Sequence, residues 1–112
     1  HIDDVAAGTY QVALRGQLGE AYHFSTPVQV SIRKLVEMIC DKMKVRFEDS
    51  VEIVNERPGK DAAYLLDSAK AKREFNWTPK ITLETGIEQT LNWLNENFEE
   101  IKKQPFDYIH KP

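Results

Sequence analysis

Cysteine, glycine and proline are all scarce in this sequence, and long apolar runs are missing from it. Among 112 residues there are one cysteine, five glycines and five prolines, which excludes a disulfide-rich, collagen-like or low-complexity chain. Because Cys40 has no partner for an internal disulfide, we expect a reducing, cytoplasmic environment. No apolar run approaches the roughly 20 residues that span a bilayer, and the start of the chain carries no signal-peptide pattern.

An excess of positive charge is also lacking. The chain has 15 Lys and Arg residues against 18 Asp and Glu residues, giving a net charge of −3, and this balance disfavours a nucleic-acid-binding protein. Hydrophobic residues make up 41%, which is typical of a globular domain and too apolar for intrinsic disorder. The chain opens on His1, in the middle of a helical pattern and without Met, so we expect it to be the end of a longer protein.

Helical periodicity is the clearest pattern in the chain. Ser31 is the predicted N-cap of a helix whose apolar face recurs at intervals of three and four residues. That face consists of Ile32, Leu35, Val36, Ile39, Cys40 and Met43. We predict three further helices: one capped by Asp3 that ends near residue 15, a short one capped by Asp67 or Ser68 that ends at residue 75, and a long one from Thr82 to residue 101.

Two short segments have the composition of strands. Residues 20–25 and 51–54 are predicted to be extended, and alternation in the first segment places His23 on the face opposite to Tyr22 and Phe24. A lone histidine in a strand is more often structural than catalytic. The order of elements predicts an α/β fold, a small and mostly helical lobe with a few short strands. Because an isolated pair of strands is marginally stable, this lobe is expected to need a partner sheet.

The loop Arg57-Pro58-Gly59-Lys60-Asp61 is the most distinctive local feature. Pro58 fixes its own φ and Gly59 tolerates a positive φ, so the pair predicts a defined turn. A guanidinium fork at Arg57 and a point charge at Lys60 have the chemistry to clamp a diphosphate. Judged from spacing alone, a solvated turn is the commoner interpretation, because short motifs of this kind often match by chance.

No catalytic or metal-binding constellation accompanies this loop. Cys40 falls on an apolar helix face and is interpreted as a small buried hydrophobic residue. His1 and His110 lie at the two ends of the chain without a Cys or His at ligand spacing, so the sequence predicts no metal site. Trp77 and Trp93 are interpreted as packing residues. Tyrosine is nowhere followed by lysine four residues later.

Six segments, taken in order, carry a recognisable family pattern. They are His1-Ile2-Asp3-Asp4-Val5-Ala6, Gly19-Glu20-Ala21-Tyr22-His23-Phe24-Ser25, Ser31-Ile32-Arg33-Lys34-Leu35-Val36, Arg57-Pro58-Gly59-Lys60-Asp61 with Tyr64 and Asp67, Lys70-Ala71-Lys72-Arg73-Glu74-Phe75-Asn76-Trp77-Thr78-Pro79, and Thr82-Leu83-Glu84-Thr85-Gly86-Ile87. Together they resemble the C-terminal part of extended short-chain dehydrogenase/reductases that act on nucleotide sugars. The nearest resemblance is to dTDP-glucose 4,6-dehydratases and related NAD-dependent epimerases.

The resemblance implies a substrate-binding role for four residues. In the family, the arginine at the position of Arg57 contacts the nucleotide diphosphate, and the residue at the position of Lys60 is often a histidine that also reaches the nucleotide. Asp61 continues the same motif, and His23 stands where the family usually has asparagine. With the resemblance counted, we favour phosphate contact by Arg57 over a solvated turn.

The resemblance also implies that the chemistry lies elsewhere. In the family, the NAD-binding glycine loop and the catalytic Tyr-x-x-x-Lys belong to an N-terminal Rossmann domain. We therefore expect residues 1–103 to form a nucleotide-sugar-binding lobe for a dTDP- or UDP-hexose, followed by a tail over residues 104–112. The expected partner is the Rossmann half, with NAD as cofactor of the parent enzyme only, and the chain alone is expected to be inactive. The alternative is a free-standing, self-associating structural or interaction module.

Overall fold

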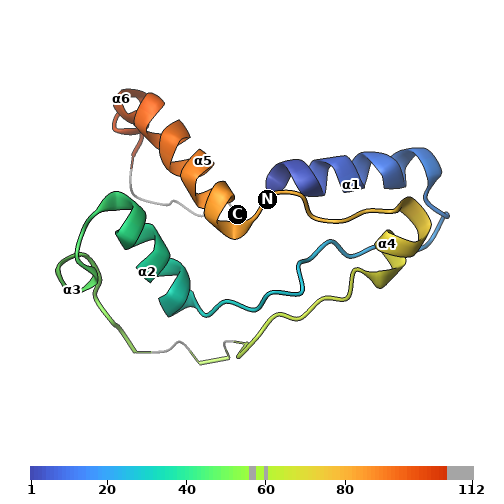
Figure 1. Ribbon diagram of the computed structural model, residues 1–112, viewed down its shortest axis with the longest axis horizontal. Coiled ribbons are helices and arrows are strands. Elements are labelled where there is room, and N and C mark those ends of the chain that lie inside the picture. The colour runs from blue at the N-terminus through green and yellow to red at the C-terminus, as the bar shows by residue number, and fades with distance from the viewer. Residues whose placement is uncertain (56–57, 60, 106–112) are drawn as a thin grey trace.

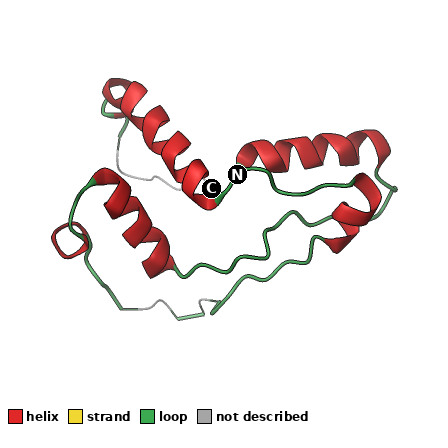
Figure 2. Cartoon of the chain, viewed as in Figure 1, coloured by secondary structure: helices red, strands yellow, loops and turns green. Residues whose placement is uncertain are grey.

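The computed structural model describes residues 1–55, 58–59 and 61–105. Within these residues the regular structure is helical (Figures 1 and 2). The elements are α1 (Ile2–Arg15), α2 (Ile32–Met43), α3 (Phe47–Ser50), α4 (Ala69–Phe75), α5 (Leu83–Glu96) and α6 (Phe98–Ile101). The prediction of a mostly helical chain is therefore confirmed, although the short α3 was not predicted.

Side-chain caps fix the starts of two helices where the sequence predicts them. The Ser31 hydroxyl accepts a hydrogen bond from the Lys34 backbone N–H at 3.1 Å, and the Thr82 hydroxyl caps α5 in the same way. The N-cap of α4 is Ser68, one of the two predicted residues, without a side-chain cap hydrogen bond, and Asp67 before it accepts from the Ala69 N–H at 2.8 Å. Each cap satisfies a backbone donor that has no partner within its helix.

Two predicted helix boundaries are wrong. The N-cap of α1 is His1, whose Nδ1 accepts from the Asp3 N–H at 3.3 Å, so Asp3 already lies in the first turn. The predicted long helix through residue 101 ends at Glu96, and α6 follows after Asn97. The Asn97 side chain donates to the Trp93 carbonyl at 2.8 Å, and such side-chain competition for backbone groups disfavours a continuous helix.

The two predicted strands are wrong as well. Residues 20–25 and 51–54 are irregular, without ladder pairing in the described part of the chain. The two extended connections run side by side (Figure 1), and in the described residues Ser25 joins them through serine side-chain hydrogen bonds to residues 66 and 68 instead of a backbone ladder. A strand is defined by such a ladder, so an apolar alternating segment without a neighbouring edge remains an extended loop.

The helices gather at two ends of an elongated molecule. α1 packs on α4 at one end, and α2 packs on α3 and α5 at the other, with two long extended connections between them (Figure 1). The radius of gyration is 17.7 Å, whereas a compact domain of this length has about 13 Å. The described chain is therefore far more open than a self-contained domain.

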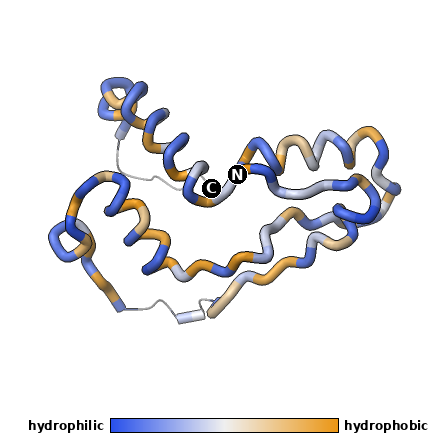
Figure 3. Tube along the Cα trace, in the orientation of Figure 1, coloured by the Kyte–Doolittle hydropathy of each residue, from blue (hydrophilic) through white to orange (hydrophobic). Residues whose placement is uncertain are grey.

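The core is correspondingly small. The buried hydrophobic residues are Ala71 and Trp77 near α4, and Cys40 and Ile87 on α2 and α5. Burial of Cys40 confirms its interpretation as a small core residue. Apolar stretches lie along the extended connections (Figure 3), and large hydrophobic residues there are exposed. They include Val28, Val30, Ile53, Val54, Tyr64, Leu65 and Leu66.

Candidate functional site

The predicted diphosphate-binding turn is described only in part. Arg57 and Lys60 lie outside the described residues. Pro58 and Gly59 form an exposed turn, and Gly59 has a φ of +78°. Because side chains rarely adopt this backbone conformation, glycine suits the position, and the prediction of a positive φ here is confirmed.

Asp61 lies exposed just after this turn, on the extended connection that leads to α4. Its carboxylate interacts with the hydroxyl of Tyr64, and this hydrogen bond raises the pKa of Tyr64 above its ordinary value. Both side chains face solvent in the described structure. The carboxylate of Asp61 is therefore available to accept hydrogen bonds from a bound molecule.

His23 is exposed, while its two neighbours are half-buried. The Tyr22 ring packs on Phe75 with a centroid distance of 5.0 Å, and the Phe24 ring packs on Trp77 at 4.9 Å. These two aromatic contacts hold one face of the segment against the helices. His23 is consequently left on the other face, as alternation predicts.

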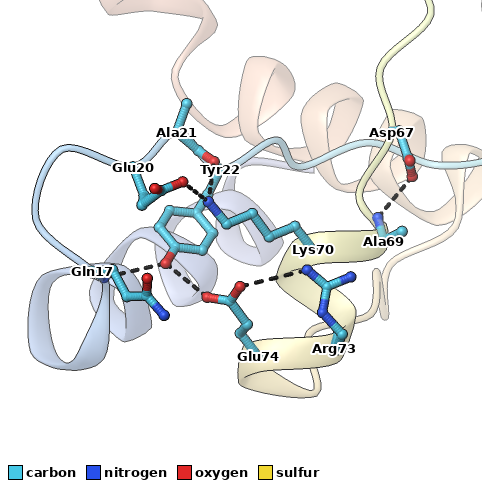
Figure 4. Close-up of polar contacts among 9 residues, drawn as sticks. All are labelled: Gln17, Glu20, Ala21, Tyr22, Asp67, Ala69, Lys70, Arg73 and Glu74. Carbon is cyan, nitrogen blue, oxygen red and sulfur yellow. Dashed lines mark hydrogen bonds and ion pairs between the residues drawn. The ribbon is translucent and has the colours of Figure 1, made fainter.

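A polar cluster fixes the same segment to α4 (Figure 4). The Tyr22 hydroxyl donates to Glu74 at 2.8 Å and accepts from the Gln17 N–H at 3.2 Å. Lys70 forms an ion pair with Glu20 at 2.6 Å, and its ammonium lies 4.2 Å from the centre of the Tyr22 ring. The sequence analysis missed this cluster, because its partners lie far apart along the chain and no local spacing connects them.

The ion pair changes the acidity of both partners. The hydrogen bond and positive charge of Lys70 lower the pKa of Glu20, and the hydrogen bond to Glu20 raises the pKa of Lys70. Each group is thus held in its charged form. Lys70 also donates to the Ala21 carbonyl at 3.2 Å, so a single side chain joins the extended segment to α4 at two points.

Two serines join the connection that carries His23 to the one that carries Asp61. The Ser25 hydroxyl donates to the Leu66 carbonyl at 2.7 Å. The Ser68 hydroxyl accepts from the Ser25 N–H at 2.7 Å and lies 3.0 Å from the Ser25 carbonyl and 2.9 Å from the Ser25 hydroxyl. We call this set of contacts between Ser25, Leu66 and Ser68 the serine clasp. It holds together two connections that the sequence places about forty residues apart.

A groove lies between the C-terminal part of α2 and the middle of α5, with a cavity volume of about 550 Å³. Lys42 and Glu88 form an ion pair that joins the two helices there. The remaining lining residues are Asp41, Met43, Lys44, Leu91, Asn92 and Asn95. Of the described site residues, neither His23 nor Asp61 lines this groove.

The described residues include no cluster of three or more His, Cys, Asp or Glu side chains able to hold a metal ion. In the same part of the chain, no helix has the length and apolar character needed to cross a membrane.

Comparison with known proteins assigns the chain to a class of sugar-modifying dehydratases. Residues 1–90 match the family model described as GDP-mannose 4,6 dehydratase. The chain belongs to this family. The motif-based resemblance to the nucleotide-sugar dehydratases is thereby confirmed.

Several curated relatives carry the name dTDP-glucose 4,6-dehydratase. The protein from Neisseria gonorrhoeae is 32% identical over 106 residues, covering 86% of this chain and 31% of the relative. One from Escherichia coli is 34% identical over 109 residues, covering 88% and 30%. One from Streptomyces antibioticus is 34% identical over 108 residues, covering 94% and 32%. The chain thus spans about a third of the length of these relatives.

Proposed function

We propose that this chain is the nucleotide-sugar-binding lobe, residues 1–103, of an NAD-dependent nucleotide-sugar 4,6-dehydratase. The observation that carries the proposal is the match of almost the whole chain to relatives named dTDP-glucose 4,6-dehydratase. The ligand would be a dTDP- or UDP-hexose. The alternative parent enzyme is a related epimerase that acts on the same class of substrate.

Arg57 is the residue we assign to the diphosphate. Its guanidinium offers paired donors that match two phosphate oxygens, and Lys60 supplies a second positive charge three residues later. Asp61 is exposed beyond the turn and would accept hydrogen bonds from sugar or ribose hydroxyls. His23, exposed on the neighbouring connection, would contribute a donor or an acceptor according to its tautomer.

The redox step would take place in another part of the parent enzyme. NAD, when bound there, supplies hydride chemistry at the hexose, while this lobe would hold the nucleotide sugar in place. The open shape of the chain and its exposed apolar residues support an extensive contact with a Rossmann half. We therefore expect the chain alone to show no turnover. NADH-dependent turnover by the purified chain would contradict this assignment.

A second candidate is a self-associating module without catalysis. The same exposed apolar residues favour it, because large apolar surfaces of soluble chains are usually covered by a partner. Light scattering over a dilution series distinguishes the two. The module would form concentration-dependent dimers or larger species, whereas a lobe that needs a different partner would not form a defined oligomer of its own.

The binding role is tested by titrating dTDP and dTDP-glucose while following tryptophan fluorescence, with the chain joined to the sequence encoded upstream of His1. Replacing Arg57 with alanine should weaken binding about tenfold or more, as expected when one charge-assisted contact worth roughly 1.5–3 kcal/mol is lost. Arg46→Ala is the matched control, because Arg46 is exposed and pairs with Asp49 beside α3. Unchanged affinity in Arg57→Ala would refute the phosphate assignment.

A further inference from the structure

We propose that Ser25 is a positioning residue for the nucleotide-sugar site, acting through the serine clasp on the connection that carries Asp61 and the preceding turn. The inference rests on the proposed function. It adds a residue that neither touches the ligand nor lies near the Arg-Pro-Gly-Lys turn in sequence.

The clasp is the main tether of that connection. In the described part of the chain, the hydrogen bonds that join residues 61–68 to the neighbouring connection all pass through Ser25 or Ser68. Residues 61–67 are exposed throughout, so packing does little to hold them. Their placement therefore depends on a few hydrogen bonds more than on buried surface.

The hydroxyls of Ser25 and Ser68 make different hydrogen bonds. Ser25 directs its single hydroxyl proton to the Leu66 carbonyl, which pulls the last part of the exposed connection against residues 20–25. Ser68 receives the Ser25 N–H and returns its own proton toward Ser25, which fixes the start of α4. Removing the Ser25 hydroxyl leaves the Leu66 carbonyl without this donor and releases the end of the connection next to α4, five residues beyond Asp61.

Ser25 itself sits on a firmly held support. Phe24 packs on Trp77, and Tyr22 is bonded to Glu74 on α4. The segment before the clasp is thus anchored by two aromatic contacts and the polar cluster. Through the clasp, the anchored residues 20–25 set the position of residues 61–67, which have no comparable anchor. The clasp thus connects the segment that carries His23 to the one that carries Asp61.

The test measures dTDP affinity and stability together in the chain joined to its upstream sequence. Ser25→Ala should weaken dTDP binding about three- to tenfold, the range expected for one hydrogen bond, and should lower the backbone NMR order parameters of residues 61–67. Ser25→Thr keeps the hydroxyl in an extended backbone and should restore both. Ser68→Ala should weaken binding as well, and the double variant should lose less than the sum of the two.

Ser31→Ala is the matched control. Ser31 caps α2, and loss of such a cap lowers stability about as much as loss of the clasp hydrogen bond, but Ser31 lies outside the clasp. The Ser31→Ala variant should bind dTDP with unchanged affinity. Equal weakening in Ser25→Ala and Ser31→Ala would show a general stability effect and overturn the inference, as would native affinity in Ser25→Ala. If the unaltered protein binds no dTDP, the proposed function fails first, and the order parameters still show whether the clasp tethers residues 61–67.

Discussion

Asp4 illustrates how much of this structure depends on single polar groups. Its carboxylate is buried and accepts hydrogen bonds from the backbone N–H groups of Lys80 and Ile81, both at 3.0 Å. Its backbone carbonyl accepts the Trp77 indole N–H at 2.8 Å. One residue of α1 therefore fixes the whole segment that leads from α4 to α5.

Replacing Asp4 with alanine should lower the free energy of unfolding by about 2–4 kcal/mol, because two backbone donors lose their buried, charged acceptor. Asp3→Ala is the control, since Asp3 is exposed and should change stability by less than about 1 kcal/mol. Urea unfolding followed by tryptophan fluorescence measures both, in the chain joined to its upstream sequence, where a cooperative transition is expected. Equal stability of the two variants would show that the Asp4 hydrogen bonds contribute little.

At this scale the sequence predicts the exposure of some residues and not of others, since Trp93, interpreted as a packing residue, is exposed. Alternation places His23 on the open face, and the apolar helix face places Cys40 in the interior. The serine clasp and the Tyr22 cluster could not be predicted, because their long-range partners lie 41–52 positions apart and a hydroxyl carries no periodic signal. Arg57 and Lys60 remain predictions from sequence.

Among the elements, α1 depends on a close approach to the first extended connection. Gly8 is buried in α1, and a Cβ built on it would lie 2.5–2.9 Å from three atoms of the Phe24 ring. That ring is itself packed on Trp77, so it has little room to move. Glycine at this position permits α1 and the connection to touch.

Gly8→Ala should therefore destabilise the chain by about 1–3 kcal/mol, although alanine has the higher helix propensity by about 1 kcal/mol. Gly86→Ala in α5 is the matched control: its Cβ would lie 3.2 Å from Cδ2 of the His1 ring, an overlap that a shift of a few tenths of an ångström relieves. That variant should be neutral or slightly more stable. Thermal unfolding measured by circular dichroism compares them, and a stabilised Gly8→Ala would contradict the close packing.

The four longer helices follow from local information. The predicted strands also required a neighbouring strand to pair with, and the described residues provide none. A cap and an apolar face specify α2 almost completely, because both lie within one segment. A strand needs a neighbouring edge. Residues 20–25 have an alternating sequence, but the adjacent connection meets them through the Ser25 and Ser68 side chains, so the same pattern produces an extended loop.

For the whole molecule, the size of the core is the decisive quantity. The few buried hydrophobic residues lie in two places, near α4 and between α2 and α5, and long exposed connections separate them. Burial of apolar surface is the main driving force of folding, and an arrangement this open buries little apolar surface. The small buried surface agrees with a chain that spans about a third of its relatives' length.

The last prediction concerns the isolated chain. By itself it should have a radius of gyration near 17.7 Å or larger by X-ray scattering, bind a hydrophobic dye, and unfold with low cooperativity. Joined to the sequence encoded upstream of His1, it should lose most of the dye binding and gain a cooperative transition, because the apolar residues of the connections become covered. A compact isolated chain near 13 Å, or a stable dimer that binds no dye, would instead show that the chain completes its own core or pairs with a second copy.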